Sequence, residues 1–126
     1  PEMQLRCGLT HPPVFSPVVD DYYKGMATTI SLHNDLLSCG KSAKAVWETL
    51  ADYYRDQAFI HVAPLGGETP MLAANTLDTL TLVVCGNETH TTVTALFDNL
   101  GKGASGAAVQ NMNLMLGFPE TTGLNL

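Results

Sequence analysis

A run of β-branched residues that leads into a glycine-rich stretch constrains this chain more than any other feature. Thr91–Phe97 begin with four β-branched residues, three Thr and one Val, which favours a strand, and Asp98–Gly103 follow directly as a turn. Beyond the turn, the spacing of small and apolar side chains predicts a helix that extends to about Leu116. The expected unit is therefore a strand, a glycine-rich turn and a helix.

The glycines of this stretch have the spacing of a dinucleotide-binding fingerprint but not its context. Gly101, Gly103 and Gly106 fit G-x-G-x-x-G, yet that motif requires a second strand and an acidic residue about 20 positions on. No strand-like run follows Gly106, so the first turn of a Rossmann fold is excluded. The glycines still allow backbone N–H groups to come close to a ligand or a packed neighbour.

The remaining elements indicate an α+β domain. Ser42–Arg55 form the clearest amphipathic helix, with Ser42 as its N-cap. The other expected strands are Ala27–His33, Phe59–Val62 and Leu80–Cys85. The last of these and His90–Phe97 flank a short Gly-Asn connection, which predicts an antiparallel hairpin in which Cys85 is a buried, small apolar residue. We expect a mixed, mostly antiparallel sheet with helices on one face.

Composition excludes several classes of function. The chain of 126 residues carries a formal net charge of −6 and only six Lys and Arg, so nucleic-acid binding is not expected. No apolar run is long enough to span a membrane. The three cysteines match no metal-binding spacing, and their odd number fits a reducing cytosol. Only 14% of residues are charged, which suggests that part of the surface is covered by another molecule.

The stretch from Asp98 to Gln110, with Asn111–Leu114 and Pro119–Leu124 after it, resembles the C-terminal end of N-acetyl-γ-glutamyl-phosphate reductases. These enzymes are relatives of the semialdehyde dehydrogenases. The resemblance covers nearly the whole chain but only the C-terminal part of the family's chains. It implies a substrate and dimerisation domain in residues 1–97. Residues 98–126 would then be a glycine-rich turn and a helix that return to a missing nucleotide-binding domain.

The resemblance also implies a reaction. Family members use NADPH to reduce N-acetyl-γ-glutamyl phosphate to an aldehyde in arginine biosynthesis, with a cysteine thiolate and a histidine. None of Cys7, Cys39 and Cys85 lies in the family's Pro-Gly-Cys-Tyr-Pro context, and the family's catalytic histidine would lie just upstream of Pro1. We therefore expect no catalytic residue in this chain, no activity from it alone, and NADP binding only together with the Rossmann domain.

The resemblance suggests which residues contribute to binding. Asn99, Gly101 and Gly103 would approach the nicotinamide end of NADPH. Lys24, where many members have Arg, and Asn75 are weaker candidates for substrate contacts; the alternatives are a solvated loop lysine and an Asn that satisfies a loop backbone. No metal ligand is expected. The expected partners are a small-molecule substrate and further copies of the chain, as a cytoplasmic dimer or tetramer, with no nucleic acid and no membrane.

Two other interpretations remain open. The first is a relative of aspartate-semialdehyde dehydrogenase, against which the terminal Gly117–Thr121 and the run Val109–Asn113 argue. The second is an interaction module that dimerises without catalysis. A substrate assay on the full-length protein separates the first from the reductase, and the upstream sequence decides the second.

Overall fold

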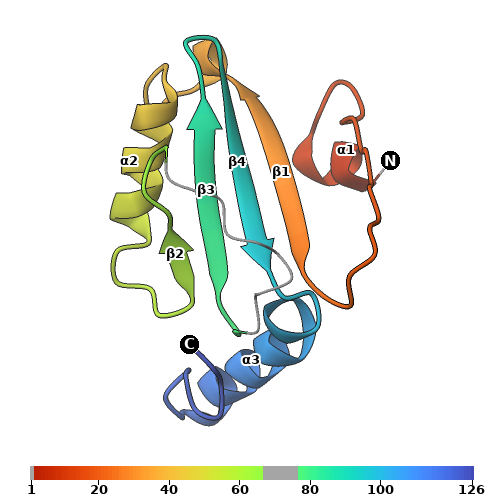
Figure 1. Ribbon diagram of the computed structural model, residues 1–126, viewed down its shortest axis with the longest axis vertical. Helices are drawn as coiled ribbons and strands as arrows, with labels where there is room; N and C mark the ends of the chain where they lie inside the picture. Colours follow the sequence, from red (N-terminus) through yellow and green to blue (C-terminus); the bar gives the residue numbers. More distant parts are fainter. Residues whose placement is uncertain (1, 67–76) are drawn as a thin grey trace.

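The computed structural model describes residues 2–66 and 77–126, which form one sheet with helices around it (Figure 1). The strands are β1 (Met26–His33), β2 (Ile60–Val62), β3 (Leu80–Gly86) and β4 (His90–Phe97). The helices are α1 (Glu2–Cys7), α2 (Ala43–Tyr53) and α3 (Gly106–Leu116), with a short 3-10 turn η1 (Asn34–Leu36) and a π-helical turn η3 (Gly101–Ser105). The α+β class expected from the sequence is confirmed.

The hairpin of β3 and β4 lies at the centre of the sheet, whose strand order is β1-β4-β3-β2. β4 pairs antiparallel with both of its neighbours, whereas the short β2 pairs parallel with β3. In this register Val93 lies opposite Ile30 on one side and opposite Val84 on the other. The sheet is therefore mixed and mostly antiparallel, as predicted.

Helix α2 is the helix that packs along the sheet, against β2, β3 and β4 (Figure 1). Its N-terminus is capped as expected, because the Ser42 hydroxyl accepts the Ala45 N–H at 3.2 Å. A Cβ at Gly86 would lie 3.0 Å from the Cβ of Ala43, so the glycine lets the first turn of α2 approach β3 closely. The buried apolar side chains between and around these elements are Val46, Phe59, Val83, Val84 and Leu96.

The other two helices lie at the margins of the sheet. α3 continues beyond the end of β4, and α1 lies on the β1 side (Figure 1). These positions leave β1 the least covered strand of the sheet. Leu32 is the only residue of β1 that is not exposed. No helix within the described residues is long and apolar enough to cross a membrane.

The segment between α1 and β1 has no regular structure and exposes large apolar side chains. It contains three prolines in His11–Pro17, which explains why it is extended rather than paired in the sheet. Val14, Val18 and Val19 are each at least 90% exposed. Apolar surface of this kind marks contacts with other molecules, so it agrees with the under-charged composition.

Two expectations about local structure are corrected. Cys85 is exposed rather than buried. Val83 and Val84 occupy the covered centre of the sheet, but Cys85 lies next to the last residue of β3, beyond that cover. The glycine-rich stretch is also not a simple turn before a helix, because Gly101–Ser105 already form a π-helical turn that continues into α3.

Candidate functional site

The candidate site is a junction between the loop before β1 and the end of β4. Asp98, which is only 3% exposed, accepts a hydrogen bond from Lys24 Nζ at 2.8 Å. The neighbouring Asn99 uses its side-chain oxygen to accept the Gly25 N–H, also at 2.8 Å. We call Lys24, Gly25, Asp98 and Asn99 the junction. Its two hydrogen bonds hold the segment just before β1 against the start of the glycine-rich stretch.

The ion pair in the junction keeps Asp98 ionised. The hydrogen bond from Lys24 is the largest cause that holds the pKa of Asp98 below its usual value of 3.8; burial opposes this shift. Backbone N–H groups of Leu100 and Gly101 stabilise the carboxylate further, the former at 2.9 Å. The side chain of Lys24 is 28% exposed and that of Asp98 is 5% exposed, so the carboxylate is the more buried partner.

The glycines after the junction face the chain's own side chains. A Cβ at Gly101 would lie 3.0 Å from Asp78 Oδ1, and a Cβ at Gly103 would lie 3.0 Å from the ring of Phe97. A Cβ at Gly106 would overlap the Asp78 carboxylate outright. Asp78 and Phe97 therefore occupy at least part of the space that these glycines leave open.

A chain of polar contacts links η3 to the end of the protein. Lys102 Nζ donates to Gln110 Oε1 at 2.8 Å and lies 5.0 Å from the centre of the Phe59 ring, which gives it a cation–π contact. Gln110 in turn donates to Glu120 at 3.1 Å. The buried Asn113 donates to the backbone carbonyls of Glu120 and Thr122. The polar side chains Gln110 and Asn113 of α3 thus find partners in the C-terminal segment of the same chain.

The C-terminal segment also reaches the glycines. Asp78 and Asn125 exchange two hydrogen bonds: the Asp78 N–H donates to the Asn125 carbonyl at 2.8 Å, and the Asn125 N–H donates to Asp78 Oδ2 at 3.1 Å. The carboxylate that lies over Gly101 and Gly106 is therefore held by the last residues of the chain. The junction, η3, α3 and the C-terminal segment form one connected unit.

The structure brings together most of the residues that the sequence suggested. Lys24 and Asn99 lie in the same junction, and Gly101 is part of the turn that begins there, with Gly103 two residues on. Asn75 lies outside the described residues. The sequence interpretation missed the ion-pair role of Asp98 and the role of Asp78. A carboxylate directly before a glycine-rich turn was the available signal for Asp98, whereas nothing local distinguished Asp78.

This arrangement can bind and orient a ligand but carries no thiol. The junction offers the exposed side chain of Asn99 and the partly exposed ammonium of Lys24. Both can form hydrogen bonds with a polar or anionic ligand. None of the four junction residues, Lys24, Gly25, Asp98 and Asn99, has a thiol or an imidazole, so catalysis through a thiolate and a histidine would require groups from elsewhere.

The chain matches a family model described as the semialdehyde dehydrogenase dimerisation domain over residues 1–99. It is also similar to curated proteins named N-acetyl-gamma-glutamyl-phosphate reductase. The protein from Brucella ovis is 44% identical over 124 residues, which cover 93% of this chain and 40% of the relative. The protein from Sinorhizobium medicae is 42% identical over 123 residues, 92% of this chain and 40% of the relative.

A third relative, named N-acetyl-gamma-glutamyl-phosphate reductase 2, comes from Nostoc sp. It is 39% identical over 133 aligned residues, which cover 98% of this chain and 41% of the relative. The chain therefore spans about two-fifths of the length of the curated relatives that it matches.

Proposed function

Because the chain belongs to the semialdehyde dehydrogenase dimerisation-domain family, we propose that it is the C-terminal part of an N-acetyl-γ-glutamyl-phosphate reductase. The whole protein would reduce N-acetyl-γ-glutamyl phosphate to the semialdehyde in arginine biosynthesis. The observation that carries the proposal is the similarity to reductases of that name along nearly the entire chain, including the glycine-rich stretch that follows residue 99. The chain by itself would be inactive.

The glycine turn would form one wall of the site for NADPH, which supplies the hydride when it is bound to the nucleotide-binding domain. Asn99 is exposed, and its side-chain oxygen is already held by the Gly25 N–H, so its NH₂ group remains to donate to the cofactor. Gly101 and Gly103 would contribute backbone groups to the wall of the site. Their Cα hydrogens lie against other side chains of the chain, Asp78 for Gly101 and Phe97 for Gly103. In this proposal Asn99 makes the polar contact and the glycines shape the turn.

Substrate contacts would come from Lys24 and Asn75. The ammonium of Lys24 has three donors, and the Asp98 carboxylate accepts one of them. The donors on its exposed side are available to a phosphate or carboxylate of the substrate. Asn75 is proposed on the family resemblance alone. The catalytic thiolate and histidine would lie in the portion of the reductase that precedes Pro1.

We further propose that the assembled enzyme is a cytoplasmic homo-oligomer, a dimer or a tetramer. The family's description as a dimerisation domain supports self-association. The exposed β1 and the apolar side chains of residues 14–19 supply surface for it.

The proposal is tested with the full-length protein and the isolated 126-residue chain. NADPH oxidation is followed spectroscopically with N-acetyl-γ-glutamyl phosphate, and aspartyl phosphate serves as the comparison substrate. We expect turnover of the acetylated substrate by the full-length protein and none by the isolated chain. Preference for aspartyl phosphate would favour the aspartate-semialdehyde dehydrogenase alternative. Turnover by the isolated chain would contradict the assignment of the catalytic groups to the preceding portion.

A further inference from the structure

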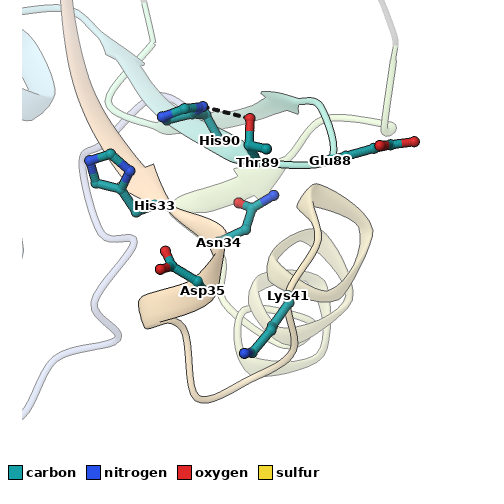
Figure 2. Close-up of a pocket in the computed structure, with 7 residues that line it drawn as sticks. All are labelled: His33, Asn34, Asp35, Lys41, Glu88, Thr89 and His90. Carbon is teal, nitrogen blue, oxygen red and sulfur yellow. Dashed lines mark hydrogen bonds between the residues drawn. The ribbon is translucent and has the colours of Figure 1, made fainter.

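Two histidines lie side by side on the sheet, far from the glycine turn. His33 ends β1 and His90 begins β4, and the antiparallel register places them directly opposite each other. Their ring centroids are 4.8 Å apart, with the planes tilted by 55°. Both side chains are exposed, and they line a cavity of about 370 Å³ together with Asn34, Asp35, Lys41, Glu88 and Thr89 (Figure 2).

The hydrogen bonds around His90 fix which ring nitrogen carries the proton. Asn87 Oδ1 accepts the backbone N–H groups of Thr89 and His90, both at 2.9 Å, so this atom must be the oxygen. The Thr89 hydroxyl lies 3.0 Å from the same oxygen and therefore donates to it. That hydroxyl also lies 2.8 Å from His90 Nδ1, where it can only accept, so neutral His90 holds its hydrogen on Nδ1 (Figure 2).

This tautomer leaves Nε2 of His90 with a free lone pair. Metal-binding histidines commonly have the same arrangement, in which one ring nitrogen donates to an oxygen and the other binds the ion. Zinc lies about 2.0–2.1 Å from each imidazole nitrogen, so one ion can bridge only two rings that are close neighbours. His33 is such a neighbour by its position opposite His90 in the ladder.

The charges that line the cavity favour a cation over an anion. Asp35 and Glu88 supply two carboxylates, and Lys41 supplies one ammonium, so the formal charge is −1 while both imidazoles are neutral. The whole chain also carries a formal net charge of −6. A phosphate or carboxylate ligand would be repelled on balance. Paired imidazoles suit zinc, copper and nickel.

We propose that His33 and His90 form a two-histidine site for a divalent transition-metal ion of the zinc class. Within the described residues no group of three or more His, Cys, Asp or Glu is placed to hold a metal ion, so water would complete the coordination. Such an ion would tie the end of β1 to the beginning of β4. Because it binds the folded state, it would also raise the melting temperature. This inference is independent of the proposed reductase activity.

Zinc binding by the intact protein that contains this chain tests the proposal. Cys7, Cys39 and Cys85 are exposed thiols, and thiols are zinc ligands in their own right, so all variants and their parent carry Ser at these three positions. His33→Phe and His90→Phe retain a paired ring but remove the nitrogens. The matched control is His61→Phe, which replaces another exposed histidine, on β2.

Titration calorimetry with zinc chloride, together with melting curves, gives the readout. We expect the His61→Phe protein to bind zinc as its parent does, whereas either His33→Phe or His90→Phe should remove one ion per chain and the accompanying rise in melting temperature. Thr89→Val keeps both ligands and should weaken binding about 10–100-fold, because it removes the acceptor for Nδ1–H. Thr89→Val also tests the two-histidine site if a Phe variant fails to fold. Equal zinc stoichiometry in the parent and the double Phe variant, or no binding by the parent, would overturn the proposal.

Discussion

The carboxylate of Asp78 occupies the space in which a side chain at Gly106 would begin. A Cβ there would overlap Oδ1 of Asp78, and a Cβ at Gly101 would lie 3.0 Å from the same atom. The start of α3 can therefore approach Asp78 only because both positions are glycine. This contact gives the glycine-rich stretch a structural purpose that requires no ligand.

Gly106→Ala should destabilise the fold by about 2 kcal/mol, within the range typical of overpacking at a close contact. Chemical denaturation followed by circular dichroism measures the change. Asp78→Ser shortens the opposing side chain, so the double variant should lose less stability than the sum of the two single variants. Strict additivity would show that Gly106 and Asp78 do not compete for this space.

Lys24→Met should destabilise the protein more than Asp98→Asn. The first change leaves a carboxylate that is 3% exposed without its charged partner, whereas the second leaves an ammonium that can still reach water. We expect a loss of about 2 kcal/mol for Lys24→Met and about 1 kcal/mol for Asp98→Asn. Urea denaturation at neutral pH measures both losses. Equal losses would mean that the burial of the carboxylate has little effect.

The pH dependence of stability should follow from the same ion pair. The pKa of Asp98 in the folded protein lies below its usual value of 3.8. Its contribution is therefore present above about pH 4 and is lost as the pH falls through the lower, folded-state pKa. Asp98→Asn should flatten the acid side of the curve of unfolding free energy against pH. Asp20→Asn, which changes an exposed aspartate, is the control and should leave that curve unchanged.

Sequence patterns located most of the elements but not the contacts between distant segments. The hairpin followed from two β-rich runs around Gly86-Asn87, and α2 followed from its helical periodicity and the Ser42 cap. These signals are local, because they depend on the period of the side chains and on the conformational preferences of Gly and Ser. The pairing of Lys24 with Asp98 joins residues 74 positions apart, so no local pattern contains it.

Local sequence patterns also did not predict which single residues are buried. Cys85 is a small apolar residue of a type common in protein cores, yet it lies outside the covered centre of the sheet. Its exposure depends on where α2 lies along β3, which the strand's own sequence does not specify. The same limit applies to Asp78, whose role arises only when the C-terminal segment folds back onto it.

In the proposed full-length reductase, Asn99→Ala should impair the use of NADPH. The change removes the exposed amide proposed to face the cofactor and the hydrogen bond to Gly25, so the KM for NADPH should rise or hydride transfer should slow. Steady-state kinetics and the primary deuterium isotope effect distinguish these results. Asn111→Ala is the matched control, because among the described residues that exposed side chain bonds only to the Ala107 carbonyl of its own helix. If both variants kept normal NADPH kinetics, the proposed cofactor role of Asn99 would be wrong.

The isolated chain should self-associate at micromolar concentration. β1 is exposed along nearly its whole length, and Ile30 in its middle is 57% exposed. Ile30→Lys should shift sedimentation profiles towards the monomer, because a charged edge opposes pairing with another strand. The control, Gln57→Lys, adds the same charge to an exposed loop and should leave the profile unchanged. A monomeric parent chain would count against the proposed role of β1.

The reciprocal hydrogen bonds between Asp78 and Asn125 have a consequence for how the molecule opens. Backbone amides near a chain end usually exchange their hydrogen with solvent rapidly, but the Asn125 amide is held by the same carboxylate that lies over Gly106. Its exchange therefore requires the C-terminal segment to leave the start of α3. The exchange rate at Asn125 would then report how often the C-terminal segment separates from Asp78.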